Sequence, residues 1–320
     1  MDPAFEGRVR DLLDTIENRL LQTAQADTDL VTGAAQHIIA AGGKRFRPML
    51  VVLSALLGTP RSDDDLARAA LVMELTHVAS LYHDDVMDEA SIRRGADSAN
   101  ARWDNTVAIL VGDFLFARAS DQVAELGPDF VRVQARTFAR LVQGQIAETV
   151  GPRPGEDPLA HYLQVVADKT GSLIAASTVF GGMVAGLSPD EIEALSAYGE
   201  ELGVVFQLSD DIIDITSDET GKTPGTDLRE GVATLPTLLL AGSDDPADAE
   251  LSAMISGDLS SDEALAETLA RLRSHRVIAE TRAEVARRAE VARSHLSVLP
   301  AGTARDALSQ LCDTVVTRSV

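Results

Sequence analysis

Two acidic pentapeptides are the residues of this chain best suited to chemistry. Asp84-Asp85-Val86-Met87-Asp88 and Asp210-Asp211-Ile212-Ile213-Asp214 each place carboxylates at i, i+1 and i+4, and each ends an apolar segment with helical periodicity. On an α-helix residues i and i+4 share a face, so Asp84 pairs with Asp88, and Asp210 with Asp214. Like charges at this spacing repel unless a cation lies between them. Hard divalent cations bind such carboxylate oxygens and can bind substrate phosphates as well. The sequence therefore predicts metal-dependent diphosphate chemistry, with all six aspartates as candidate ligands.

The duplication of the motif strengthens this interpretation. One acidic helix end is weak evidence, because such ends are common on solvated surfaces. Here each copy follows an uncharged helical segment, Leu75–Tyr82 and Val204–Ser209. Carboxylates at the ends of buried helices should face a cleft, and we expect Mg²⁺ there, with about three ions per active site.

The lysines form a complementary set of cations. Only three of the 28 Lys and Arg residues are lysines, namely Lys44, Lys169 and Lys222, and each lies in or beside a candidate site segment. The segment Gly42–Pro48 is a glycine turn followed by cations at a helix start. Its backbone N–H groups, with Lys44 and Arg47, could bind a phosphate. A merely solvated helix start is the alternative.

Further polar residues lie on the same helix faces as the motifs. Arg93 and Arg94 follow the first motif, and adjacent arginines can serve two different anions. His77 lies seven residues before Asp84, and Gln207 is placed similarly before the second motif. A lone histidine on an apolar helix is as readily a hydrogen-bonded core residue, so both interpretations of His77 stay open.

Composition favours a helical protein of the globular class. Among 320 residues, 45% are hydrophobic, 24% charged and only 4% aromatic, and no segment alternates with period two. These features predict an all-α fold, a single domain over residues 1–320 with about ten or more helices. We expect helices at about 5–40, 48–57, 63–88, 106–126, 129–150, 157–187, 189–216, 263–297 and 302–318. Loops are expected at 95–105 and 218–231, and a surface excursion at 242–262.

Charge and cysteine content limit the partners and the compartment. The formal net charge of −22 argues against nucleic acid as a partner. A lone cysteine, Cys312, excludes an intrachain disulfide, and no signal peptide is visible, so we expect a cytoplasmic protein. The uncharged run Gly171–Leu187 is short for a membrane span and rich in glycine, which favours a buried helix over a transmembrane one.

With these residues in hand, the chain resembles the trans-polyprenyl diphosphate synthases, particularly long-chain actinobacterial members. The resemblance runs over most of the chain. It rests on the two acidic motifs and on the segments Gly42–Pro48, His77–Asp88, Arg93–Gly95, Gly112–Phe114, Lys169–Gly171, Phe206–Asp214 and Gly221–Leu228. It implies an isoprenoid-synthase bundle around a deep central cavity, usually in a homodimer. It also implies a Mg²⁺-dependent condensation of isopentenyl diphosphate with an allylic diphosphate.

The resemblance also implies roles for individual residues. Asp84, Asp88 and Asp210 would ligate Mg²⁺ on the allylic diphosphate, and Asp214 would support them. The allylic diphosphate would be bound by Arg93, Lys169, Thr170, Gln207 and Lys222, and isopentenyl diphosphate by Lys44, Arg47, His77 and Arg94. The catalytic group would comprise Asp84, Asp88, Asp210, Lys169 and Lys222.

Three further residues matter: one departs from the family pattern, and two concern product specificity. Val232 stands where many members carry a second lysine, so one diphosphate contact should be missing or supplied by an arginine such as Arg229. Ala79 and Ser80 lie five and four residues before Asp84, where short-chain relatives carry a bulky aromatic residue. Their small side chains predict an open tunnel and a hepta- to decaprenyl product, suited to a quinone side chain.

Other functions fit the residues less well. A geranylgeranyl diphosphate synthase differs only in product length and is the main alternative. A class I terpene cyclase would need neither the Gly42–Pro48 segment nor a second complete acidic motif. A non-catalytic partner subunit typically lacks the acidic motifs. A metal-buffering protein would not explain the placement of the lysines.

Overall fold

The computed structural model describes residues 2–216 and 224–318, and the predicted all-α class is confirmed. Among these residues the exception to helix is a hairpin of two short strands, β1 (Ile92–Arg93) and β2 (Ala96–Asp97). The chain divides into two compact units. The first comprises Met1–Ala139, Leu173–Gly199 and Val298–Leu308, and the second comprises Arg140–Ser172, Glu200–Ser297 and Ser309–Val320.

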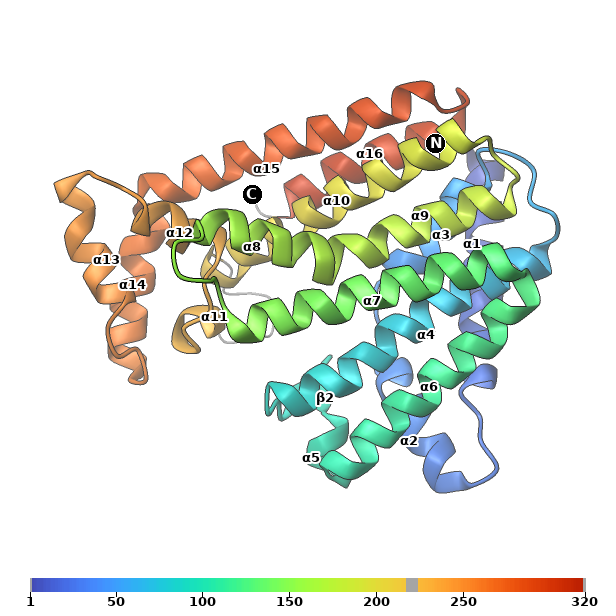
Figure 1. Cartoon of the computed structure of the whole chain (residues 1–320), viewed down its shortest axis with the longest axis horizontal. Coiled ribbons are helices and arrows are strands. Elements are labelled where there is room, and N and C mark those ends of the chain that lie inside the picture. Colours follow the sequence, from blue (N-terminus) through green and yellow to red (C-terminus); the bar gives the residue numbers. More distant parts are fainter. Residues whose placement is uncertain (1, 217–223, 319–320) are drawn as a thin grey trace. The chain divides into compact units, whose positions relative to one another are not determined.

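The first unit is built around α4, which carries the first acidic motif at its end. Figure 1 shows α4 beside α6, and α1 and α3 also pack against α4, whereas α2 lies against α6. Nearly all middle residues of α4 are buried. This burial is expected of a helix that carries apolar residues on all of its faces. Tyr82 ties it to α2, since its hydroxyl donates to the carbonyl of Ala34. The bounds of the helices are α1 (Pro3–Thr23), α2 (Asp29–Ala40), α3 (Phe46–Ala55), α4 (Asp63–Met87), α5 (Ala99–Trp103) and α6 (Asn105–Leu126).

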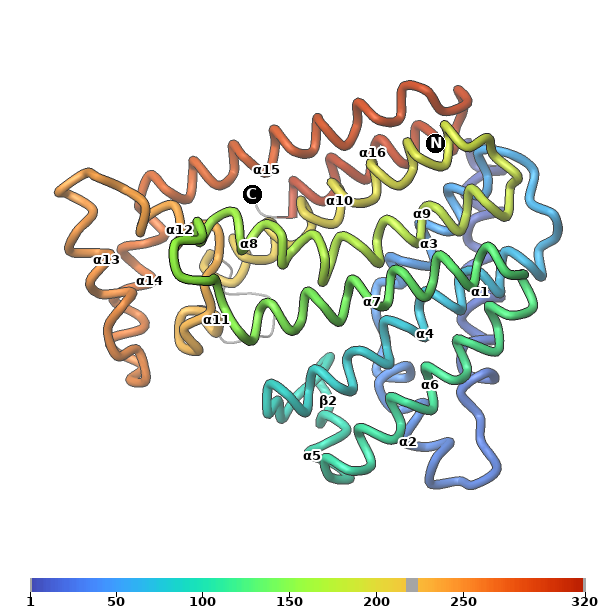
Figure 2. Tube along the Cα trace, viewed as in Figure 1, coloured from blue at the N-terminus to red at the C-terminus, as the bar shows by residue number. Residues whose placement is uncertain are grey.

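The second unit carries the second acidic motif. Its own elements are α8 (Pro158–Val166), the π-turn η1 (Ala167–Gly171), α11 (Thr226–Arg229), α12 (Leu235–Ala241), η2 (Pro246–Asp248), α13 (Ala249–Ile255), α14 (Asp262–Ser274), α15 (Arg276–His295) and η3 (Leu296–Val298), whose last residue belongs to the first unit. Leu251 and Leu259 join a buried cluster with Leu269 and Ile278. The predicted surface excursion at 242–262 is therefore partly wrong, since it contains α13, which Figure 2 shows beside α14.

Four helices contribute residues to both units: α7 (Pro128–Val150), α9 (Ser172–Val184), α10 (Pro189–Thr216) and α16 (Thr303–Thr317). Helix α9 covers most of the uncharged run. Its Phe180 and Val184 are fully buried, as a helix inside a bundle requires. No helix in the described part of the chain is long and apolar enough to cross a membrane.

Several expected boundaries were wrong, each for a local reason. The helix expected at 5–40 is two helices, because Thr28 caps α2 by accepting from the N–H of Val31. The expected loop at 95–105 contains α5, which Ser98 caps in the same way. The helix expected at 263–297 breaks at His275, whose side chain caps α15. Periodicity alone does not reveal such caps when the apolar pattern continues across them.

Gly181 allows α9 to approach α3 closely, and this yields a prediction about stability. A Cβ at Gly181 would lie 2.3 Å from the backbone carbonyl oxygen of Val51, which cannot move away independently. Gly181→Ala should therefore lower the free energy of unfolding by about 3 kcal/mol through overpacking. Gly33→Ala is the control, because nothing lies within 4 Å of its Cβ position in α2. It should leave stability unchanged or raise it by up to about 1 kcal/mol in urea unfolding. Equal effects of the two substitutions would contradict the packing argument.

Candidate functional site

The first acidic motif separates into two kinds of carboxylate. Asp84 is half-buried in the last turn of α4, and Asp88 is the exposed C-cap residue, whose N–H donates to the Asp84 carbonyl at 2.8 Å. Asp85, by contrast, is fully buried. The pair at i and i+4 therefore lies at an accessible helix end, whereas the middle carboxylate points into the protein.

Asp85 holds Arg93. The guanidinium of Arg93 donates to one Asp85 oxygen through Nε at 2.7 Å and a terminal nitrogen at 2.5 Å. Burial raises the pKa of Asp85, and the hydrogen bond from Arg93 opposes part of that rise. The hairpin that carries Arg93 turns through Arg94 and Gly95, with φ of 54° and 77°, as a two-residue turn of the primed type requires. Asp85 thus contributes by positioning the hairpin and its arginine.

Arg47, Arg94 and His77 form a half-buried cationic cluster in the first unit. The Nε of Arg47 is buried and has no hydrogen-bond partner in the described part of the chain. Burial lowers the pKa of Arg47 to about 10, so this residue remains charged at neutral pH. Burial lowers the pKa of His77 well below its usual range, and the neighbouring arginines, Arg47 first, lower it further. His77 is therefore neutral beside several guanidinium groups.

The arginines of this cluster have no acid of their own, because Glu74, whose charge acts on both Arg47 and Arg94, is hydrogen-bonded to Arg45. Arg94 donates to the backbone carbonyls of Ile38, at 2.9 Å, and Gly42. Neither Arg94 nor Arg47 has an ion-pair partner among the residues that the structure describes. Burial is also the main reason that the pKa of Arg94 is lowered. Two half-buried guanidinium groups without an ion pair favour a bound anion, and a phosphate can accept several hydrogen bonds from them.

Arg45 has a structural role that the sequence did not reveal. Its guanidinium binds Glu17 of α1 with two hydrogen bonds, at 2.5 and 2.7 Å, and donates to Glu74 of α4 at 3.0 Å. It also donates to the carbonyl of Ile39 at the end of α2. Arg45 adopts φ of 47° immediately before α3. Of the three cations in this segment, it is the one that connects the helices around the cluster.

The clamp made by Arg45 predicts a large effect on stability. Arg45→Ala would leave the carboxylate of Glu74, which is 2% exposed, without its cation. Breaking a buried ion pair from one side costs about 3 kcal/mol or more in unfolding free energy. Arg132→Ala is the control, because the Arg132–Asp129 pair is exposed and should contribute less than about 1 kcal/mol. Urea unfolding measures both, and similar losses would show that Arg45 is not a clamp.

The second acidic motif, in α10, shows the same division. Asp210 and Asp214 are half-buried, whereas Asp211 is 2% exposed. Asp214 accepts from the N–H of Asp227 at 3.3 Å and so reaches the start of α11. Asp210 accepts from Arg318 at 2.8 Å, and this guanidinium also lies over the Phe206 ring, 4.6 Å from its centroid. Arg318 is 108 residues away in sequence, and no local signal predicts its contact.

Three groups hold the Asp211 carboxylate inside the second unit. They are the Tyr162 hydroxyl, the Gln207 side-chain amide at 3.2 Å and the Leu235 N–H at 3.3 Å. Burial raises the pKa of Asp211 to about 6, although these hydrogen bonds act in the opposite direction. Burial and the nearby Asp211 raise the pKa of Tyr162 well above its usual range. Asp211 is therefore an anchor between α8, α10 and α12.

The π-turn η1 places Lys169 and Thr170. Lys169 pairs with Glu148 of α7 at 2.5 Å, and Thr170 donates to Gln207 at 3.3 Å. Arg140 supports the turn, since it donates to Asp168 and to Glu200, each at 2.8 Å. π-turns inside helices often mark functional sites. The structure thus places Thr170 against Gln207, while Lys169 of the same turn pairs with Glu148.

The remaining predicted residues have separate surroundings. Lys222 lies outside the described residues. Lys44 is exposed in the turn before Arg45. Val232 is 42% exposed, and Arg229, which was expected to replace the family lysine, instead forms an ion pair with Asp262 at 2.5 Å. The expected substitution by Arg229 therefore does not match its contacts.

Ala79 and Ser80 occupy different faces of α4. Ser80 lies about 40° around the helix from Asp84, and Ala79 about 140°. His83, one turn after Ala79, packs against Gly112 of α6 and hydrogen-bonds to the Ile109 carbonyl at 3.0 Å. His83 is thus a packing residue, and Ala79 shares its face. Ser80 shares the face of Asp84.

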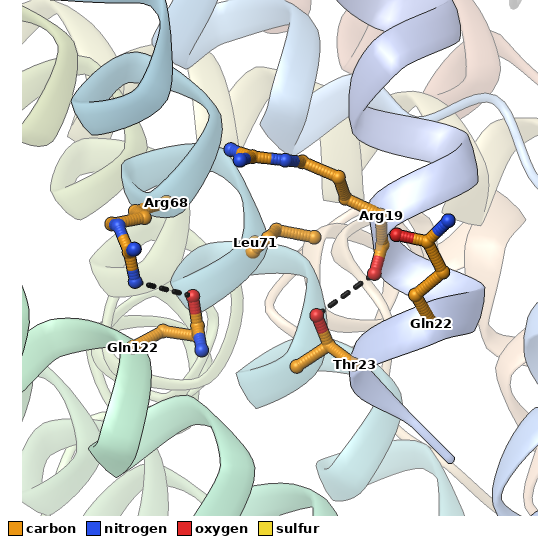
Figure 3. A pocket seen from close by; sticks show the side chains of 6 residues that line it. All are labelled: Arg19, Gln22, Thr23, Arg68, Leu71 and Gln122. Carbon is orange, nitrogen blue, oxygen red and sulfur yellow. Dashed lines mark hydrogen bonds between the residues drawn. The ribbon is translucent and has the colours of Figure 1, made fainter.

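A shallow pocket lies elsewhere in the first unit. Figure 3 shows it between α1, α4 and α6, lined by Arg19, Gln22, Thr23, Arg68, Leu71 and Gln122. Its two arginines both bind Asp64, and it contains no predicted site residue. Among the described residues, no three His, Cys, Asp or Glu side chains form a ready metal site. A metal would thus need oxygen ligands beyond one aspartate pair, which substrate phosphates or water supply to Mg²⁺.

Comparison with known proteins identifies relatives over the whole chain. Residues 28–272 match the polyprenyl synthetase family model. Nonaprenyl diphosphate synthase of Mycobacterium tuberculosis is 47% identical over 314 residues, which cover 98% of this chain and 92% of that protein. Geranylgeranyl pyrophosphate synthase from Corynebacterium glutamicum, solved with calcium and isoprenyl diphosphate, aligns with a TM-score of 0.89. Its sequence is 44% identical, and the alignment covers 99% of this chain and 98% of that one. A decaprenyl diphosphate synthase from Rhodobacter capsulatus has the same TM-score at 31% identity, with 98% of each chain covered.

Proposed function

The chain belongs to the polyprenyl synthetase family, and we propose that it condenses isopentenyl diphosphate with an allylic diphosphate to an all-trans, long-chain polyprenyl diphosphate. The observation that carries this proposal is the half-buried cluster of Arg47, Arg94 and neutral His77, in which neither arginine forms an ion pair among the described residues and which therefore suits a diphosphate. The nonaprenyl and decaprenyl relatives support a long product.

We assign the metal to the accessible aspartate pairs. Asp84 and Asp88 in the first unit, and Asp210 and Asp214 in the second, would hold Mg²⁺, whereas Asp85 and Asp211 position their neighbours. The calcium in the Corynebacterium structure supports a divalent cation. When bound, Mg²⁺ would neutralise charge on the departing diphosphate.

The side chains of this chain bind and orient the two substrates. Arg47, Arg94 and His77, with the exposed Lys44, would hold isopentenyl diphosphate. Arg93, Lys169, Thr170 and Gln207, with Lys222, would hold the allylic diphosphate. The allylic C–O bond breaks and the electron pair leaves with diphosphate. The isopentenyl double bond then attacks the allylic cation, and the proton lost goes to the released diphosphate. Fixed cations around the leaving group favour this ionisation because they need no reorganisation.

An elongation assay tests the proposal and distinguishes a long-chain synthase from its main alternative, a geranylgeranyl diphosphate synthase. The protein is incubated with Mg²⁺, labelled isopentenyl diphosphate and each allylic primer in turn, and the products are sized by chromatography. We expect hepta- to decaprenyl products. A geranylgeranyl product would establish the second candidate, which the Corynebacterium structure favours. No elongation from any primer would refute the function.

We also propose a cytoplasmic homodimer. Ile109 and Leu110 are exposed apolar residues on α6, and a second copy would cover them. Leu110→Arg should shift the mass measured by light scattering from dimer to monomer. Leu30→Arg, at a position on α2 that is 59% exposed against 61% for Leu110, should leave the mass unchanged. A monomeric parent protein, or a Leu110→Arg variant that stays dimeric, would contradict this interface.

A further inference from the structure

The middle carboxylate of the second acidic motif is built into the protein more firmly than a metal ligand needs to be. Asp211 accepts hydrogen bonds from three elements: Tyr162 on α8, Gln207 one turn earlier on α10, and the backbone of Leu235 at the start of α12. Its exposed fraction is 2%. A carboxylate with its oxygens occupied in this way acts on its neighbours.

The neighbour that Asp211 controls is Gln207. An ionised carboxylate only accepts hydrogen bonds, so the amide nitrogen of Gln207 must face Asp211 and its oxygen must face away. In that orientation the Gln207 oxygen accepts from the hydroxyl of Thr170, at 3.3 Å. A flipped amide would place two acceptors together at Asp211, whereas the Thr170 hydroxyl could adapt to either orientation. The charge of Asp211 therefore selects one of the two amide orientations.

We propose that Tyr162 is a positioning residue of the allylic-diphosphate subsite, acting through Asp211 on Gln207. This inference rests on the proposed function, in which Lys169, Thr170 and Gln207 contact that diphosphate. Phosphate oxygens accept hydrogen bonds, so Gln207 must present an N–H group to them. With one amide hydrogen on Asp211, the other remains for the substrate. Tyr162 keeps this arrangement because its hydroxyl, with the Leu235 N–H, holds the second oxygen of Asp211 in place.

Tyr162→Phe tests the proposal because it removes the hydroxyl and keeps the ring. We expect KM for the allylic diphosphate, and the dissociation constant of an unreactive allylic thiolodiphosphate in calorimetry, to rise about tenfold. KM for isopentenyl diphosphate should change less than about twofold, since Tyr162 contacts no residue assigned to that subsite. A purely structural role would not produce this split between the two substrates.

Tyr198→Phe is the matched control. Tyr198 is fully buried, whereas Tyr162 is half-buried, and the Tyr198 hydroxyl donates to the carbonyl of Leu308 at 2.7 Å in the first unit. Its loss should lower the melting temperature but change neither KM. If Tyr162→Phe behaves like Tyr198→Phe, Tyr162 only stabilises the fold and the proposal is overturned.

A double-mutant cycle with Gln207→Glu tests the route of the effect. Gln207→Glu removes the amide hydrogens, so adding Tyr162→Phe should raise the allylic KM by less than about twofold further. Additive effects would overturn the assignment of Gln207 as the intermediate. A separate variant, Asp211→Asn, covers the case in which Tyr162→Phe alone folds poorly. In the same assay it should give the same selective rise in the allylic KM. Failure of the parent protein to elongate any primer would refute the proposed function, whereas an active parent with unchanged allylic KM in the variants refutes only this inference.

Discussion

Asp84→Asn is expected to lower kcat for chain elongation by about a thousandfold. The substitution keeps the shape of the side chain but removes the charge that would hold Mg²⁺ at the accessible end of α4. Metal stabilisation of a leaving phosphoryl oxygen contributes several kcal/mol, and about 4 kcal/mol corresponds to three orders of magnitude in rate. Incorporation of labelled isopentenyl diphosphate at saturating substrates measures the effect. The Mg²⁺ concentration for half-maximal activity should also rise.

Asp129→Asn is the control for this substitution. Asp129 is 76% exposed at the start of α7 and pairs only with Arg132 among the described residues. The Asp129→Asn substitution should leave both kcat and the Mg²⁺ dependence unchanged. If Asp84→Asn keeps more than about a tenth of the parental kcat at every Mg²⁺ concentration, Asp84 is not a metal ligand that the reaction needs.

Ser80→Phe is expected to shorten the product from the long-chain range towards geranylgeranyl or farnesyl size. Ser80 lies one turn below Asp84 on nearly the same face of α4, and its hydroxyl donates within the helix to the His77 carbonyl at 2.8 Å. A phenyl ring there would block a chain growing away from the metal site along α4. Chromatographic sizing of the products gives the readout.

Ala79→Phe should shorten the product as well, but at a greater loss of stability. Ala79 is fully buried on the face that packs against Gly112 of α6. A phenylalanine ring at this position must therefore displace α6. Leu30→Phe, at an exposed position, is the control and should change neither product length nor stability. Unchanged product lengths in both Ser80→Phe and Ala79→Phe would show that the tunnel does not run along this part of α4.

The sequence by itself determined the helical class, most long helices and the residue types of the site. These features depend on local information: apolar residues at helical spacing, proline and glycine breaks, and carboxylates one turn apart. The helices expected at 106–126, 129–150 and 189–216 match α6, α7 and α10 almost to the residue. The residues adjacent to each of these helices determine where it begins and ends.

Tertiary structure alone decided what each polar side chain does. Asp84 and Asp85 are identical residues next to each other, yet one lies at an accessible helix end and the other is buried against Arg93. Arg45 and Arg47 are likewise two residues apart, but Arg45 pairs with Glu17 and Glu74, whereas Arg47 forms no ion pair with any residue that the structure describes. Asp210 meets Arg318 from the far end of the chain. The physical reason is that burial and the charges of distant neighbours set the state of an ionisable group, and neither is encoded at the position of the group itself.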